Sequence, residues 1–203
     1  MTSNPSSLDI YIHLANGDTL HFKQEDPTEA KALIESLKPH TIFTQTLLVI
    51  AGRHSLTAFS PNKIARIDLA MPGYPGWSFP FNAQDIVEIT EEEFQENYLP
   101  LEKTTTREQQ LTQPGEIITT FAKIELTNRE RFYVQMTVPV TERTPLDIQM
   151  FLQQLFTSHT LFARRREGGV ILLNAEHVAR ITSFPGPRQT PPNAWAAHYV
   201  SEQ

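Results

Sequence analysis

The first apolar positions of the chain alternate with polar ones, which predicts a β-hairpin over residues 10–24. Ile10, Ile12 and Leu14 fall on every second position, and the alternation returns at Leu20 beyond an Asn-Gly pair. A strand places alternate side chains on one face, and Asn-Gly suits the positive φ angles of a two-residue turn. One half-buried face is therefore expected on this hairpin.

After the hairpin, the spacing of the apolar residues changes from every second position to helical spacing, which predicts a helix. Asp26 suits the N-cap position, Pro27 the first helical position, and Glu29 the third residue of a capping box. Pro39 ends the segment. The apolar residues recur at helical spacing on one face: Ala30, Leu33, Ile34 and Leu37. Strands over 42–50, 55–59 and 63–69 complete a β-β-α-β-β unit.

The same order of elements returns later in the chain. A hairpin over 123–136, a helix over 144–155 and strands over 161–165, 170–173 and 178–181 repeat the pattern. Matched motifs carry the likeness. The first copy has His-Thr-Ile-Phe at 40–43 and Ile-Ala-Arg-Ile at 64–67, whereas the second has His-Thr-Leu-Phe at 159–162 and Val-Ala-Arg-Ile at 178–181. An internal duplication of this kind predicts two related structural units.

The sequence therefore predicts an α+β fold of two tandem β-β-α-β-β repeats related by an approximate twofold. The first repeat gains an added strand near 81–90 and a short acidic helix up to Leu99. The expected divisions are a first repeat domain with these additions, a polar linker, a second repeat domain and an extended Pro-rich tail, at 1–99, 100–116, 117–186 and 187–203.

Composition narrows the class of protein. The chain has 203 residues and no cysteine, which excludes disulfides, thiolate metal ligands and thiol catalysis. The polar start lacks the features of a signal peptide, and no apolar run approaches the roughly 18 residues that cross a bilayer. A cytoplasmic protein without a membrane partner is expected. The net charge of −6 comes from an acidic middle, whereas the second repeat is mildly basic.

The strongest candidate for binding is Arg164-Arg165-Arg166 beside Gly168-Gly169, because the first copy has Leu48-Val49-Ile50-Ala51 there instead. Arginines on a hairpin could bind phosphate, nucleic acid or the acidic segment of the same chain. A solvated hairpin tip is the alternative. Since neighbouring strand residues face opposite ways, at most two of the three arginines act together.

Two further pairs of residues match between the copies. Arg66 and Arg180 could each hold an anion, or each pair with a neighbouring carboxylate on the sheet. Trp77 and Trp195 each follow a Pro-Gly turn and could anchor a partner or cover the core of their own repeat. Tyr199 extends the aromatic character of the tail.

No known catalytic motif occurs in the chain, and eight glycines leave little material for a nucleotide-binding loop. The matched His40 and His159 supply at most two ligands, so neither a metal nor a cofactor is expected. The favoured function is a non-enzymatic binding or adaptor protein with a protein partner, which could also form a homo-oligomer. Nucleic-acid binding through the second repeat is the alternative, followed by an enzyme or small-molecule carrier with a pocket between the repeats.

Overall fold

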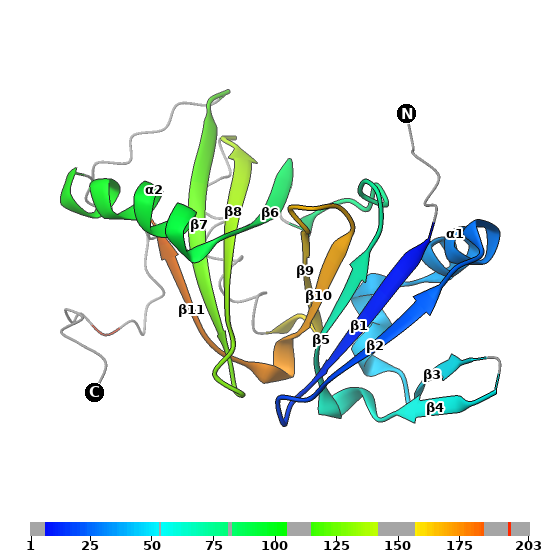
Figure 1. Cartoon of the computed structure of the whole chain (residues 1–203). Helices are drawn as coiled ribbons and strands as arrows, with labels where there is room; N and C mark the ends of the chain where they lie inside the picture. The colour runs from blue at the N-terminus through cyan, green and yellow to red at the C-terminus, as the bar shows by residue number, and fades with distance from the viewer. Residues whose placement is uncertain are drawn as a thin grey trace.

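The computed structural model describes residues 7–52, 54–80, 83–104, 115–141, 157–184 and 195, and the side chains of 7–52, 54–80, 83–98, 115–141, 157–184 and 195. A large, mostly antiparallel sheet with few helices makes the fold α+β (Figure 1). The nine strands of this sheet are β1 Leu8–Leu14, β2 Thr19–Gln24, β5 Ile64–Ala70, β6 Asp85–Ile89, β7 Ile117–Leu126, β8 Arg131–Pro139, β9 Thr160–Arg164, β10 Val170–Asn174 and β11 Val178–Phe184. The other elements are helices α1 Pro27–Ser36 and α2 Glu91–Thr104, 3-10 helices η1 Pro39–Thr44, η2 Pro61–Lys63 and η5 Ala175–His177, and strands β3 Leu48–Ala51 and β4 Leu56–Phe59.

The large sheet has the strand order β11-β7-β8-β6-β9-β10-β5-β1-β2. Strands from both halves of the chain therefore hydrogen-bond within one sheet. They meet where β6 lies between β8 and β9, and where β10 lies antiparallel to β5, with Leu172 opposite Ile67. β6 and β9 are parallel to each other, whereas the other neighbouring strands of this sheet run antiparallel. The predicted domain boundaries stay a prediction.

Asp26 is the N-cap of helix α1, as its sequence predicts, but the Asp26 N–H donates to Gln24 instead of to the Glu29 side chain expected in a capping box. The Asp26 side chain accepts hydrogen bonds from the backbone N–H groups of Thr28, at 2.7 Å, and Glu29, at 3.2 Å. Pro27 takes the first helical position, where a missing N–H costs nothing because it would have no partner inside the helix. The buried residues of α1 are Ala30 and Ile34, which lie one turn apart on the face that packs against the sheet.

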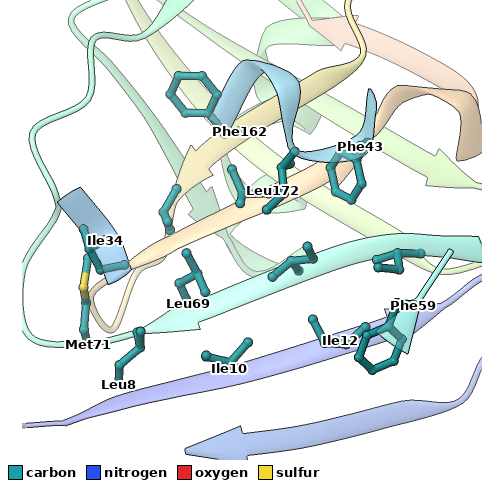
Figure 2. Packing of buried hydrophobic residues seen from close by; sticks show 14 of the residues in the cluster. Leu8, Ile10, Ile12, Ile34, Phe43, Phe59, Leu69, Met71, Phe162 and Leu172 are labelled. Atoms are coloured by element: carbon teal, nitrogen blue, oxygen red, sulfur yellow. The ribbon is translucent and has the colours of Figure 1, made fainter. Parts of the chain in front are cut away.

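The first hydrophobic core lies on the α1 side of the sheet. Figure 2 shows Leu8, Ile10 and Ile12 of β1 beside Leu69 of β5 and Leu172 of β10. The residues that cover them come from separate segments of the first half of the chain: Ile34 of α1, Phe43 of η1, Phe59 of β4 and Met71. The predicted alternation on the first hairpin thus gives one buried face.

The second core lies on the opposite face of the same sheet. The side chains of β10 show this directly, because Val170 and Leu172 belong to the first core, whereas Ile171 and Leu173 belong to the second. Every residue of β10 is buried. A strand buried on both faces reads as a continuous apolar run, as Val-Ile-Leu-Leu does here.

A third, aromatic cluster joins α2 to the sheet. Phe94 of α2 packs against Tyr133 of β8, with ring centroids 4.9 Å apart, and Phe121 of β7 completes the cluster. Thr90 and Glu93 form a capping box at the start of α2, with both reciprocal hydrogen bonds at 3.0 and 3.2 Å. The helix then continues to Thr104. The predicted end of this helix at Leu99 was therefore too early, because Pro100 does not end the helix.

The predicted strand over 42–50 was wrong in its first half. Residues 39–44 form the 3-10 helix η1, and only Leu48–Ala51 forms β3. Pro39 sits in the first turn of η1, and the hydroxyl groups of Thr41 and Thr44 donate to the carbonyls of Lys38 and Thr41. These local bonds compete with strand pairing. Two predicted features lie outside the described residues: the helix over 144–155 and the tail over 187–203, apart from Trp195.

The turn between β9 and β10 packs tightly against the chain that follows β5. Gly168 and Gly169 have φ angles of +106° and +92°, and the Gly169 N–H donates to the Gly73 carbonyl at 2.5 Å. A Cβ atom on Gly169 would lie 1.9 Å from the Leu69 carbonyl oxygen. Glycine is thus required at residue 169 both by the backbone angle and by the close approach.

We expect Gly169→Ala to lower the free energy of unfolding by about 3 kcal/mol, since a left-handed residue and overpacking each cost about 1–2 kcal/mol. Gly17→Ala is the matched control, because Gly17 has a φ of +96° but nothing within 4 Å of its Cβ position. It should lose only about 1 kcal/mol. Urea denaturation followed by circular dichroism measures both. Equal losses would show that the contact with Leu69 is unimportant.

Candidate functional site

The three arginines at the β9–β10 hairpin face carboxylates of the same chain. Arg164 binds Asp85 of β6 through two hydrogen bonds of 2.5 and 3.2 Å. Arg166 lies 2.8 Å from the carboxylate of Glu93, the residue that also closes the capping box of α2. These contacts balance the charges of Arg164 and Arg166 within the fold and fasten the hairpin to β6 and α2.

Arg165 lies on the other side of the hairpin, as strand alternation requires. Its side chain is 18% exposed, its Nη2 lies 3.9 Å from Glu167, and its buried Nε has no hydrogen-bond partner within the part of the chain that the structure describes. Burial raises the pKa of Glu88, and the charge of Arg165 opposes that rise only in part. The acidic segment of the protein itself is thus the nearest partner of the arginine hairpin.

Arg66 forms a buried ionic cluster with carboxylates from three elements. Its Nε and Nη2 bind Asp68 at 2.6 and 2.8 Å, and its Nη1 binds Glu130, in the β7–β8 turn, at 2.6 Å. Glu88 of β6 lies 3.6 Å away. The guanidinium also sits 5.4 Å from the ring centroid of Phe132. The side chains of Arg66 and Asp68 are only 12% and 7% exposed, so these charges are largely removed from water.

The cluster links strands that are distant within the sheet, because β5 and β8 are separated by three strands in the strand order. Arg66 of β5 still reaches Glu130 beside β8, and Ala65 of β5 joins residues of β7 and β8 in the second core. The sheet must therefore curl until these strands face each other. A second link at the same end is the 2.8 Å contact from His177 to the Asn62 carbonyl.

His13 of β1 completes the cluster at its edge. Its Nδ1 lies 3.1 Å from the Thr19 hydroxyl, and its Nε2 lies 3.4 Å from the Asp68 carboxylate without making a hydrogen bond to it. Thr19 is exposed on β2. This arrangement supplies a histidine and a carboxylate, but the described residues around it offer no group that would hold a substrate there.

Arg180, the counterpart of Arg66, makes a simpler contact. Its Nη2 lies 2.6 Å from Glu125 on the neighbouring strand, and its side chain is 42% exposed. Trp77 lies partly buried against the first core, with its ring centroid 6.3 Å from that of Phe162. Trp195 is 96% exposed, whereas Tyr199 lies outside the described residues. The structure thus brings both matched arginines to carboxylates, whereas one matched tryptophan is partly buried and the other is exposed.

The two-stranded sheet β3–β4 presents an apolar face that the sequence did not reveal. Leu48 and Phe59 face the first core, and Val49 pairs with Ala58 on the outer face. Val49 is 43% exposed, and Leu56, which pairs with Ala51 on the same face, is 70% exposed. Leu47 adds a further side chain that is 50% exposed. Neither strand carries a charged residue.

An apolar groove of about 420 Å³ runs beside this hairpin. Its floor consists of residues of β1 and β5, one wall belongs to α1, and the other wall is β3. Three consecutive residues of β3 line the groove, namely Leu48, Val49 and Ile50, so it follows the edge of that strand. A volume of this size falls in the range of ligand pockets, which is about 300–1,000 Å³. We call the hairpin face and the groove together the β3 surface.

One sequence signal could have pointed to the β3 surface. Residues 47–51 read Leu-Leu-Val-Ile-Ala, so both faces of the strand are apolar and alternation is absent. That pattern is typical of a strand covered on both faces, yet here one face meets no described part of the chain. The described residues contain no group of three or more metal-binding side chains and no helix that could span a membrane.

Comparisons with protein-family models, curated proteins and solved structures find no match to this chain. The geometry of the described residues is therefore the basis for the function proposed below.

We expect Arg66→Ala to lower the free energy of unfolding by about 3–5 kcal/mol, because it leaves buried carboxylates without their counter-charge. Arg180→Ala, at the matched position, should cost less than about 1 kcal/mol, since its ion pair is exposed to solvent. Guanidinium chloride denaturation compares the two. Similar losses in the free energy of unfolding would show that the buried ion pairs of Arg66 stabilise the fold no more than the exposed ion pair of Arg180.

The pH dependence of stability tests the same cluster. Burial pushes the pKa of Asp68 upward, but the contacts of His13 and Arg66 outweigh it and hold the pKa below its ordinary value. Burial raises the pKa of Glu88, with the charge of Arg66 opposing it only in part. Ionised Asp68 therefore stabilises the fold above the pKa of an unfolded aspartate, and this contribution disappears on acidification. Ionised Glu88 opposes folding.

Asp68→Asn should accordingly destabilise the protein at neutral pH and have little effect at acid pH. Glu88→Gln should stabilise it at neutral pH, with the gain lost below the ordinary glutamate pKa of about 4.3. Thermal unfolding measured from about pH 2 to about pH 8, which spans the ordinary carboxyl pKa values of about 3.9 and 4.3, checks both predicted directions. A stabilising Asp68→Asn substitution at neutral pH would contradict the assignment.

Proposed function

We propose that the protein is a non-enzymatic binding or adaptor protein that mediates protein–protein interaction or assembly. The observation that supports this most directly is the β3 surface, where an apolar two-stranded sheet is exposed beside an apolar groove. Unpaired strand edges attract other chains, and soluble proteins usually protect them with charged residues, proline or bulges. β3 and β4 contain none of these residues.

The hairpin at the matching place in the second half makes the contrast clear. β9–β10 is paired on both sides within the large sheet, by β6 and by β5. β3–β4 forms a separate sheet, and no described strand pairs with either of its outer edges. Neighbouring strands therefore cover both edges of the β9–β10 hairpin, whereas both outer edges of the β3–β4 hairpin are left without a described strand. Binding by a protein partner would bury its outer face and its edge.

We also infer that the two halves are tandem β-β-α-β-β repeats with a pseudo-twofold relation. The triplets β2-β1-β5 and β8-β7-β11 have the same strand order along the sheet, and each strand direction is reversed between them. A half-turn about an axis that crosses the strands, combined with a shift along that axis, has this result and also exchanges the two faces. The matched residues Ile12 and Ile124 support it, since they lie in cores on opposite faces.

The alternative functions receive less support. Nucleic-acid binding would use Arg164 and Arg166, but these side chains already face Asp85 and Glu93. A pocket between the repeats would suit a small molecule, but the cavity under the curled sheet, lined by residues such as Met136 and Ile86, holds only about 40 Å³. That volume is far below the usual size of a ligand pocket.

We expect the double variant Val49→Lys and Leu56→Lys to lose its protein partners, with recovery in affinity purification reduced at least about tenfold, as for loss of an interface hot spot. Two charges on the outer face remove apolar area without touching the first core. Quantitative mass spectrometry of material purified from nuclease-treated lysate measures the recovery.

Ile117→Lys is the control for this experiment, because Ile117 is another exposed apolar side chain, 59% exposed, at the start of β7. It should retain the same partners as the unmodified protein. Equal recovery by the double variant would contradict a role for the β3 surface. Partners that disappear after nuclease treatment alone would favour the nucleic-acid alternative.

A further inference from the structure

The hydrogen bonds of the β3–β4 hairpin show which backbone groups of β3 are free. The Gly52 N–H donates to the Ser55 carbonyl at 2.8 Å, which fixes the alternation of bonded and non-bonded pairs along the ladder. Ile50 and Thr57 then form a bonded pair, whereas Val49 and Ala51 point their N–H and C=O groups away from β4. Val49 also lines the groove. The unpaired backbone groups of β3 therefore face the groove.

This geometry suits the addition of one extended strand. The strand would pair with the edge of β3, while its alternate side chains enter the groove between β3 and α1. The floor of the groove is formed by residues such as Ile12 and Leu69, which are buried side chains of the first core. A matching segment needs free backbone N–H groups and apolar side chains at every second position.

The segment around Trp195 meets both requirements. Trp195, Ala197 and Tyr199 occur at every second position, so an extended backbone places them on one face. No proline follows Pro192, so each later residue of the printed sequence keeps its N–H group. Trp195 is 96% exposed, which leaves its large apolar ring without a covering surface. Aromatic side chains of this kind are the usual anchors of protein interfaces.

We propose that the segment containing Trp195 and Tyr199 of one copy of this chain adds as a strand to β3 of a second copy, with Trp195 in the groove. This inference rests on the proposed function and names its partner. The contact is heterologous, because it joins two different surfaces, the tail of one copy and the β3 surface of the next. Such contacts produce rings or open chains of subunits.

The place of the tail favours a second copy over the groove of the same molecule. The tail follows β11 at one edge of the sheet, whereas β1, on the floor of the groove, lies seven strand intervals away (Figure 1). Seven intervals of about 4.8 Å make a path of about 34 Å when it follows the surface of the curled sheet. The eleven residues from Phe184 to Trp195 reach about 36–40 Å only when fully extended. A path around the same molecule would leave almost no slack.

The test is sedimentation velocity of the full chain across a wide range of concentration. The unmodified protein should form oligomers whose size rises with concentration. Trp195→Ala and Val49→Pro should each remain monomeric, with association weakened more than tenfold. Proline removes the edge N–H of residue 49, which pairs with no group of β4. His198→Ala is the control. In an extended strand His198 faces away from the side of Trp195 and Tyr199, so this variant should associate normally.

Mixing the two monomeric variants gives the decisive result. Trp195→Ala keeps an intact groove, and Val49→Pro keeps an intact tail, so the mixture should form a one-to-one dimer that neither variant forms alone. Failure of the mixture to associate would overturn the proposal, as would a Trp195→Ala variant that associates normally. If Val49→Pro unfolds the hairpin, Ser36→Arg replaces it, because this exposed position on α1 lines the groove.

The same variants separate this inference from the proposed function. If the unmodified chain stays monomeric while Val49→Lys with Leu56→Lys still loses other protein partners, the β3 surface binds proteins but not its own tail. If neither self-association nor partner binding depends on the β3 surface, both proposals fail. Self-association that persists in all variants would place the contact elsewhere and overturn the tail-to-groove assignment.

Discussion

The structure depends on one strand, β10, that is buried on both faces. Its alternate residues Val170 and Leu172 enter the first core, and Ile171 and Leu173 enter the second. Neither core can form completely without this strand, so the two halves of the chain share their most buried element. The hydrophobic gain from burying four large side chains at once is a strong reason for β9 and β10 to insert between β5 and β6.

Charge then fixes the curvature that this insertion requires. A curled sheet brings β5 opposite β7 and β8, and the buried Arg66 holds that position by contacting carboxylates from its own strand, from β6 and from the β7–β8 turn. Because a buried ion without partners is strongly unfavourable, the cluster specifies one geometry. The arginines at 164 and 166 act in the same sense, fastening the hairpin tip to β6 and α2.

The two β-hairpins at matching places in the halves have opposite surroundings. β9–β10 contributes its residues to the interior, whereas β3–β4 stands apart with an apolar outer face and a free edge beside the groove (Figure 1). The basic residues that first suggested a binding role are engaged in holding the fold together. Under the proposed function, the uncharged residues of β3 and β4 offer the surface instead, so the candidate site lies in the first half of the chain.

The elements that the sequence predicts correctly depend on interactions between residues close together in the chain. The first hairpin, helix α1 with its Asp26 cap, β6 and the start of α2 follow from alternation, helical spacing and capping residues, all of which act within a few positions. The sequence also paired Arg66 with Arg180 and placed both on strands. It failed at Ile42 and Phe43, where hydroxyl-to-carbonyl bonds of neighbouring threonines favour a 3-10 helix over a strand.

Tertiary structure alone decided the rest, because it depends on contacts between residues far apart in the chain. The burial of Arg66 and the exposure of Arg180 follow from the curl of the sheet, which no local pattern encodes. The apolar run 47–51 has the composition of a covered strand, and only the strand order shows that β3 lies outside the large sheet. Sequence therefore determined which segments form strands and helices, whereas long-range packing decided which apolar faces became core and which became surface.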